Sequence, residues 1–259
     1  QLANTLARRV TLDNAGRLRH WGEIEQLADL AAALDHKPVA MNLTRFIRFP
    51  RVEPAIAAVR TIRALDVPQT RPIIVDYLGE LIELSQGVDA EVARLKAKDK
   101  IQAYLEYIGD QYRIAEQVAL TIGVWAEPSA DPLLRSIIPK MHPIGVNVRA
   151  AGIWALGHIH AGNGPPELGP VLVARMIDNK ALTPEADNVR EQATVALGRM
   201  MMNAQLKALE KKYRDEQDTT TMRYAARWSV GQITGTLPPE LTFDPVEIRD
   251  TFIVPLFQP

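Results

Sequence analysis

Val189-Arg-Glu-Gln-Ala-Thr-Val-Ala-Leu-Gly198 is a stretch whose pattern returns along the chain. Its closest copy is Val148-Arg-Ala-Ala-Gly-Ile-Trp-Ala-Leu-Gly157, which keeps the valine, the arginine and the final Ala-Leu-Gly at the same spacing. Five segments align on the last glycine, namely Arg71 to Gly79, Ala115 to Gly123, Arg149 to Gly157, Arg190 to Gly198 and Arg223 to Gly231. These glycines lie 44, 34, 41 and 33 residues apart. Self-similarity at such a period is typical of stacked structural repeats.

Apolar and small residues keep fixed distances from these glycines. The residues directly before them are Leu78, Ile122, Leu156, Leu197 and Val230, and the residues five positions before them are Ile74, Val118, Gly152, Ala193 and Ala226. Offsets of one and five follow a single stripe of an α-helix. A glycine inside a helix costs ~1 kcal/mol relative to alanine. Its return therefore predicts a neighbouring backbone that passes too close for a side chain.

A second apolar helix follows each glycine after a break. Gly162-Asn-Gly-Pro-Pro166 precedes apolar residues from Leu168 to Ile177, and apolar residues at helical spacing run from Val92 to Ile108. No alternating pattern typical of β-strands competes with these helices. We therefore expect a repeated hairpin in which the helix that contains the glycine comes first.

The segments that end at Gly157 and Gly198 resemble the HEAT-repeat family, in particular the short HEAT-like repeats first described in phycobilisome lyases. The resemblance covers roughly residues 70 to 236. It implies an all-α fold, a right-handed α-α superhelix of stacked hairpins, and by default a binding module. Because the family includes scaffolds, transport factors, enzymes and nucleic-acid binders, the resemblance predicts the fold more specifically than the chemistry.

The pattern divides the chain into three parts. Residues 1–68 read as an N-terminal helical cap or divergent repeats, and residues 69–236 carry the HEAT-like repeats. Residues 237–259 are rich in proline and are expected to pack on the last repeat through Phe243, Phe252 and Phe257, or to begin a longer array.

Composition excludes several classes of function. The formal net charge is -1, which argues against nucleic acid or an anionic membrane as the partner. Cysteine is absent, so disulfides, thiolate zinc sites and cysteine nucleophiles are excluded. No apolar run approaches the ~18 residues of a membrane span. The compartment stays open.

Two features suggest chemistry but favour structural roles. His158 and His160 lie at a helix end, where residues two apart diverge, so we expect neither a metal nor a cofactor. Trp154 and Trp228 both stand three residues before a glycine, and we expect them to fill the gap between hairpins. The alternative is an aromatic lining like that of the HEAT-like alkylpurine DNA glycosylases.

Arginines also recur in register, eight positions before four of the glycines, at Arg71, Arg149, Arg190 and Arg223. An arginine at the start of each glycine helix can bond the loop of the adjacent repeat through its planar donor fork. A structural role is the leading interpretation. A ladder that faces an anionic ligand is the alternative.

Two sets of basic residues are candidates for binding. The segment Arg45-Phe-Ile-Arg-Phe-Pro-Arg51 would present Arg45, Arg48 and Arg51 to a phosphate or an acidic peptide. The other set belongs to the second helices of the hairpins, which usually line the concave side of such an array: Arg94, Arg135, Arg175 and Lys207. A further group of basic residues is interleaved with Glu210, Asp215 and Glu216 and reads as a solvated helix face: Lys207, Lys211, Lys212 and Arg214.

We therefore expect a non-catalytic scaffold that binds another protein or the rest of a longer polypeptide. An enzyme of the bilin-lyase or DNA-glycosylase kind is one alternative. A solenoid that binds anions or nucleic acid is the other.

Overall fold

The protein is all-helical over the residues that the computed structural model describes, which are 22–96, 101–180 and 182–241. The α-helices are α2 (Gly22–Ala33), α3 (Ala40–Leu43), α4 (Val52–Leu65), α5 (Arg71–Gln86), α6 (Val88–Lys96), α7 (Ile101–Trp125), α8 (Asp131–Ser136), α9 (Val146–Ile159), α10 (Leu168–Met176), α11 (Asp187–Arg199), α12 (Leu206–Arg214) and α13 (Thr220–Thr234). Single turns of 3-10 helix precede α3, α5, α8 and α12, and they are η2 (Lys37–Val39), η3 (Pro68–Thr70), η4 (Pro128–Ala130) and η5 (Asn203–Gln205). No described helix is long and apolar enough to cross a lipid bilayer.

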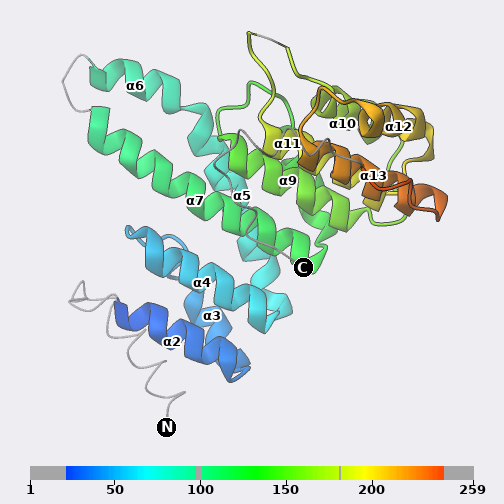
Figure 1. The fold of residues 1–259 in the computed structure, drawn as a ribbon. Coiled ribbons are helices and arrows are strands. Elements are labelled where there is room, and N and C mark those ends of the chain that lie inside the picture. Colours follow the sequence, from blue (N-terminus) through cyan, green and yellow to red (C-terminus); the bar gives the residue numbers. More distant parts are fainter. Residues whose placement is uncertain (1–21, 97–100, 181, 242–259) are drawn as a thin grey trace, which may run out of the picture.

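Most of these helices form two layers. In one layer, α2, α4, α7, α9, α11 and α13 follow one another, and each packs on the next (Figure 1). In the other layer, α8, α10 and α12 pack on α9, α11 and α13, respectively. We call α7, α9, α11 and α13 the glycine helices, because they contain the recurring glycine.

The glycines lie where successive glycine helices approach most closely. A methyl group on Gly198 would lie 2.5 Å from the Cα atom of Ser229, which is far inside van der Waals contact. Three of the recurring glycines each meet the residue that stands two positions before the next recurring glycine. Gly123 meets Ala155, Gly157 meets Ala196 and Gly198 meets Ser229. The prediction that a neighbouring backbone excludes a side chain is confirmed at Gly123 and Gly198, whereas at Gly157 the nearest backbone atom would lie 3.2 Å away, which is a tight contact.

Gly79 does not belong to this series. It lies in α5, and a methyl group added to it would meet only the side chain of Leu133, at 3.8 Å. Helix α5 starts after a 3-10 turn and carries Pro72 in its first turn, as α8 starts after η4 and carries Pro132. The alignment of residues 71–79 with the other four segments is therefore wrong, because α5 is the counterpart of α8. The layer that contains the glycine helices continues instead into α4, which packs on α7.

The hairpins are also paired differently from the expectation. Each glycine helix packs on the helix that precedes it, so α8 pairs with α9, α10 with α11, and α12 with α13. The glycine helix is thus the second helix of its hairpin. The stretch from Val92 to Ile108 is not the single second helix that its apolar spacing predicts, because it is shared between α6 and the start of the long helix α7. Helix α6 packs on α5 and α7 and projects with the start of α7 away from the other helices (Figure 1).

The described start of the predicted tail packs on the last hairpin. The side chain of Leu237 covers Gly231 of α13, and the Nε–H of Arg227 donates to the carbonyl of Pro238 at 2.9 Å. The hydroxyl of Tyr213 donates to the carbonyl of Pro239 at 2.8 Å. The expected anchors Phe243, Phe252 and Phe257 and residues 1–21 of the expected cap lie outside the described residues.

Candidate functional site

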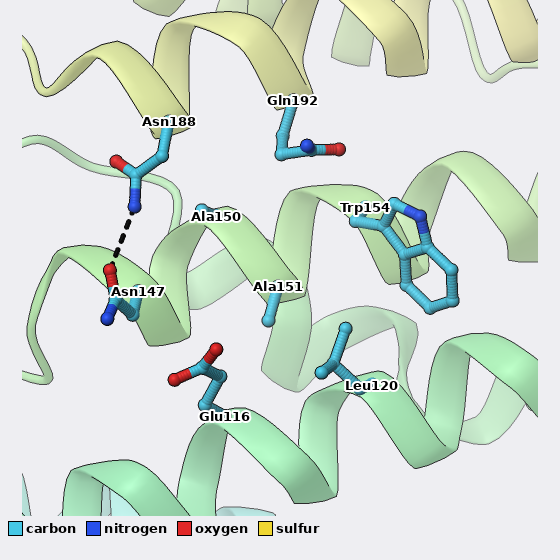
Figure 2. A pocket seen from close by; sticks show the side chains of 8 residues that line it. All are labelled: Glu116, Leu120, Asn147, Ala150, Ala151, Trp154, Asn188 and Gln192. Atoms are coloured by element: carbon cyan, nitrogen blue, oxygen red, sulfur yellow. Dashed lines mark hydrogen bonds between the residues drawn. The ribbon is translucent and has the colours of Figure 1, made fainter. Parts of the chain in front are cut away.

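A hollow of about 320 Å³ lies on the surface of three successive glycine helices. It is lined by Glu116 and Leu120 of α7, by Asn147, Ala150, Ala151 and Trp154 of α9, and by Asn188 and Gln192 of α11 (Figure 2). A second hollow of about 220 Å³ adjoins it and shares Glu116 and Asn147. We call the surface formed by these residues the glycine face.

Small residues and amides give this hollow its character. Ala150 and Ala151 of α9 have short side chains, and they form the part of the lining between the longer side chains of α7 and α11, as Figure 2 shows. The Nδ2–H of Asn188 donates to the Oδ1 of Asn147 at 2.9 Å, which joins α11 to α9 across the hollow. A carboxamide offers both donors and acceptors, so these groups match the needs of a peptide backbone. Glu116 is the one ionisable group in the lining.

The search for charged motifs missed the two asparagines. A signal for them is present in the repeat register, because the residues ten positions before the glycines are Arg113, Asn147, Asn188 and Thr221. This row is polar on four successive helices, whereas the rows that face the core are apolar.

Trp154 and Trp228 are both partly exposed, and Trp154 also packs between α9 and α7. Trp154 lies across Gly123, lines the hollow, and packs against His158 with 4.0 Å between the ring centroids and 49° between the ring planes. Trp228 occupies the same place on α13, and the guanidinium carbon of Arg199 lies 5.9 Å from the centre of its ring. The packing role expected for Trp154 is confirmed, but this side chain is also part of the glycine face.

Arg149 shows the structural role expected for the recurring arginine. Its side chain donates to both carboxylate oxygens of Glu185, at 2.9 and 2.7 Å, and to the carbonyl of Ile138 at 3.0 Å. Arg149 is 4% exposed and Glu185 is 2% exposed. Burial raises the pKa of Glu185, but the hydrogen bonds from Arg149 and from the backbone N–H of Ala186 hold it below its ordinary value. Glu185 precedes α11, so the pair ties one hairpin to the next.

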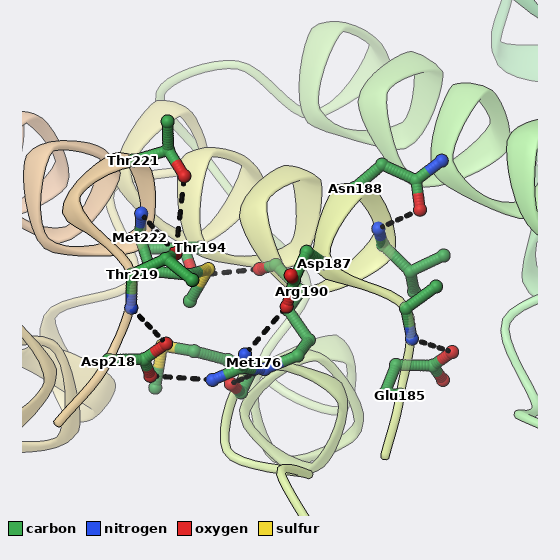
Figure 3. Close-up of polar contacts among 12 residues, drawn as sticks. Met176, Glu185, Asp187, Asn188, Arg190, Thr194, Asp218, Thr219, Thr221 and Met222 are labelled. Carbon is green, nitrogen blue, oxygen red and sulfur yellow. Dashed lines mark hydrogen bonds and ion pairs between the residues drawn. The ribbon is translucent and has the colours of Figure 1, made fainter. Parts of the chain in front are cut away.

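Arg190 repeats this arrangement one hairpin later (Figure 3). Its side chain donates to Asp218, before α13, at 2.6 Å and to Asp187 at 2.9 Å. Lys212 also donates to Asp218 at 2.6 Å and is buried, so the solvated face expected from Lys207 to Lys212 is wrong at that lysine. Burial raises the pKa of Asp218, but Lys212, the N–H of Thr219 and Arg190 hold it below its ordinary value.

The other two arginines of the expected ladder differ from this pair. Arg223 donates to the carbonyl of Tyr213 at 3.2 Å. Arg71 lies in α5, in the other layer, and pairs with Asp66 and Glu127. The structural interpretation is confirmed for Arg149 and Arg190, and the contacts of Arg71 and Arg223 are structural as well, although Arg71 does not belong to the ladder.

The segment from Arg45 to Arg51 follows α3 as a series of turns. The guanidinium of Arg48 binds both carboxylate oxygens of Glu80, at 2.8 and 2.5 Å, and lies 4.8 Å from the ring centre of Tyr77. Arg45 and Arg51 are exposed. Glu80 offsets one of the three positive charges, which weakens the case for a phosphate site at this place.

The second set of candidates does not gather on one face. Arg94 is on the projecting helix α6 and pairs with Glu91 of the same helix. Arg135, Arg175 and Lys207 lie on α8, α10 and α12, in the layer opposite the glycine helices. Arg135 pairs with Asp131 and Glu167, and Arg175 pairs with Glu185. Lys207 is exposed.

The two histidines diverge, as their spacing predicts. The ring of His158 packs at a tilt against that of Trp154, whereas the Nε2 atom of His160 lies 2.5 Å from the Oδ1 atom of Asp131 and joins α9 to α8. Within the described ranges, no three metal-ligating side chains come together in a group that could hold an ion.

A scan against models of known protein families gives no match to this chain. A search of curated proteins also finds no match.

Proposed function

We propose that this protein is a non-catalytic scaffold of HEAT-like hairpins, wound as a right-handed α-α superhelix, that binds another protein along its glycine face. Three recurring details support the repeat. They are the contact of a glycine with a small residue, the buried arginine that binds a carboxylate of the next hairpin, and a left-handed residue followed by a 3-10 turn. The left-handed residues are Asp35, Asp66, Ala126 and Met201.

The packing of the layers supports the choice of face. The glycine helices pack directly on one another, whereas α8, α10 and α12 pack mainly on the glycine helices. If the helices of one layer are more closely spaced than those of the other, the array of hairpins bends toward the more closely spaced layer. The glycine face is therefore proposed as the concave surface of the array, which is where solenoid proteins bind their partners.

The observation that carries the proposal is the hollow across α7, α9 and α11. Its lining combines apolar side chains with three amides, Asn147, Asn188 and Gln192. An extended peptide needs both kinds of contact, because its backbone is polar and its side chains alternate between faces. A catalytic site would bring together several ionisable groups, and this lining contains only Glu116.

The alternatives have weaker support in the same region. A bilin-lyase or glycosylase would need convergent ionisable groups or a basic groove. A nucleic-acid binder would need a row of cations that follows the phosphates. The arginine of the adjoining hollow, Arg113, pairs with Asp110 at 3.3 Å and lies beside Glu116.

Site-specific photocross-linking in cells tests the proposal. A photoreactive amino acid at Gln192 should capture a distinct protein, whereas the same group at exposed Lys207 of α12 should not. Capture from Lys207 alone would place the partner on the opposite layer and refute the glycine face. Cross-links from Gln192 to DNA or RNA, together with binding that falls steeply with salt, would favour the nucleic-acid alternative.

A further inference from the structure

Arg199 differs from the arginines that hold the hairpins together. Arg149 and Arg190 are each bound to a carboxylate, whereas Arg199 makes no ion pair with any carboxylate of the described residues. Its Nη1 atom is buried without a hydrogen-bond partner and lies 3.7 Å from the place where a Cβ atom of Gly157 would be. Burial lowers the pKa of Arg199. The residue as a whole is partly exposed, so Arg199 has lost water contacts at Nη1 alone, and no carboxylate of the described residues compensates for that loss.

The surroundings of Arg199 are aromatic and apolar. Its guanidinium carbon lies 5.9 Å from the ring centre of Trp228, and its charge acts on His158, whose ring packs at a tilt against that of Trp154. The Nε2 atom of His158 is also buried without a partner, and burial, followed by the charge of Arg199, lowers the pKa of His158. The imidazole is therefore neutral at neutral pH, and Arg199 carries the positive charge of this cluster.

The cluster is continuous with the glycine face. The residues three positions before the glycines of α7, α9, α11 and α13 are Leu120, Trp154, Val195 and Trp228, and all four are partly exposed. We call these four residues, with His158 and Arg199, the tryptophan strip. Leu120 and Trp154 also line the larger hollow, so a bound peptide could contact both regions at once.

We propose that Arg199 receives a carboxylate of the partner protein, an aspartate or glutamate whose flanking apolar side chains pack on Trp154 and Trp228. This inference rests on the proposed function, because it needs a partner on the glycine face. A single cation among apolar side chains suits one carboxylate, whereas a nucleic acid would need several cations in a row. The carboxylate would also provide an acceptor for the guanidinium of Arg199.

Peptide arrays test the acidic residue directly. Three sets of short synthetic peptides have glutamate, glutamine or lysine at the central position. The flanking positions are random mixtures of leucine, tryptophan, serine and glycine. Each set is probed with the labelled full chain. The glutamate set should bind about ten- to a hundredfold more tightly than the glutamine set, as expected for a charge-assisted hydrogen bond. Arg199→Gln should remove this difference, and Arg199→Glu should shift the preference to lysine.

Lys207→Glu is the matched control, because it makes the same change of charge on the opposite layer and should leave the preference unchanged. Thermal unfolding of each variant verifies that it is folded. A wild-type chain that binds the three sets equally, or binds none of them, would overturn the inference. Retention of the glutamate preference by Arg199→Glu would do the same. Cross-linking at Gln192 decides the proposed function independently of these results.

The chain's own acidic residues are the other possible occupant. Residues 242–259 contain Asp244, Glu247 and Asp250 among aromatic residues. A variant with the corresponding amides at all three positions should bind the peptides as the wild-type chain does. Glutamate binding that appears only in this variant would identify the chain itself as the occupant and overturn the proposal of a partner's carboxylate.

Discussion

The two ends of the glycine helices use arginine in opposite ways. Near their starts, Arg149 and Arg190 are almost fully buried, and each binds a carboxylate from the next hairpin. At the end of α11, Arg199 is partly exposed and lies beside the ring of Trp228, without such a carboxylate among the described residues. A cation can hold two hairpins together through an ion pair only when the fold also supplies its anion. Where the fold supplies none, the cation is available to a second molecule.

The largest effect is expected for Arg149→Ala. This change leaves Glu185 buried with only Arg175 and a backbone N–H near it, and breaking a buried ion pair costs about 3–5 kcal/mol. Chemical denaturation measures this loss. Arg48→Ala is the control, because its pair with Glu80 is exposed and should contribute less than about 1 kcal/mol. Equal losses in the two variants would remove the distinction between buried and exposed pairs.

A smaller effect is expected for Gly198→Ala. The added methyl group would meet the backbone of Ser229 on α13, and overpacking costs about 1–3 kcal/mol. The free energy of unfolding should fall by this amount. A variant as stable as the wild-type chain would show that α11 and α13 can move apart freely.

Acid should weaken the buried pairs. Because the pKa values of Glu185 and Asp218 are lowered in the folded state, their stabilisation is complete above the ordinary pKa values of glutamate and aspartate. It is lost as the pH falls through the lower values of the folded protein. The stability difference between the wild-type chain and Arg149→Ala should therefore shrink between neutral pH and about pH 3. Denaturation at both pH values checks this, and a constant difference would contradict the role of Glu185.

The smallest effect has the opposite sign. Gly79→Ala should stabilise the protein by about 0.5–1 kcal/mol, because alanine has the higher helix propensity and the nearest atom is a flexible leucine side chain at 3.8 Å. Thermal unfolding together with that of Gly198→Ala gives the comparison. Destabilisation by both changes would restore Gly79 to the series of close contacts.

The sequence predicted the contacts that depend on local spacing. The apolar stripe, the glycines that meet a small residue, and the roles of Arg149 and Arg190 all follow from helical periodicity and from the chemistry of one side chain. The order of helices within a hairpin did not follow, because an apolar stripe shows which face is buried but does not show which neighbouring helix covers it. The error at Gly79 has the same cause, since that glycine also lies beside apolar residues in a helix.

The candidate site was harder to predict for a different reason. Arg94, Arg135, Arg175 and Lys207 were chosen by charge and by an order of helices that the structure reverses. The hollow depends instead on Ala150 and Ala151, which matter because they are small, and on neutral amides from two helices. Small residues and neutral amides do not form a recognisable sequence motif. They become visible only when the register shows that Asn147 and Asn188 stand at the same place on adjacent helices.

The contact between a glycine and a small residue makes the hairpins interchangeable units. Helix α9 presents Gly157 to Ala196 of α11, and α11 presents Gly198 to Ser229 of α13, so α11 has the same kind of surface on both sides. A second copy of residues 160–199, which include the connection before α10, could be inserted after the first, because the new junction would again place a glycine against an alanine. Duplication or deletion of one hairpin would therefore change the length of the array without requiring a new interface.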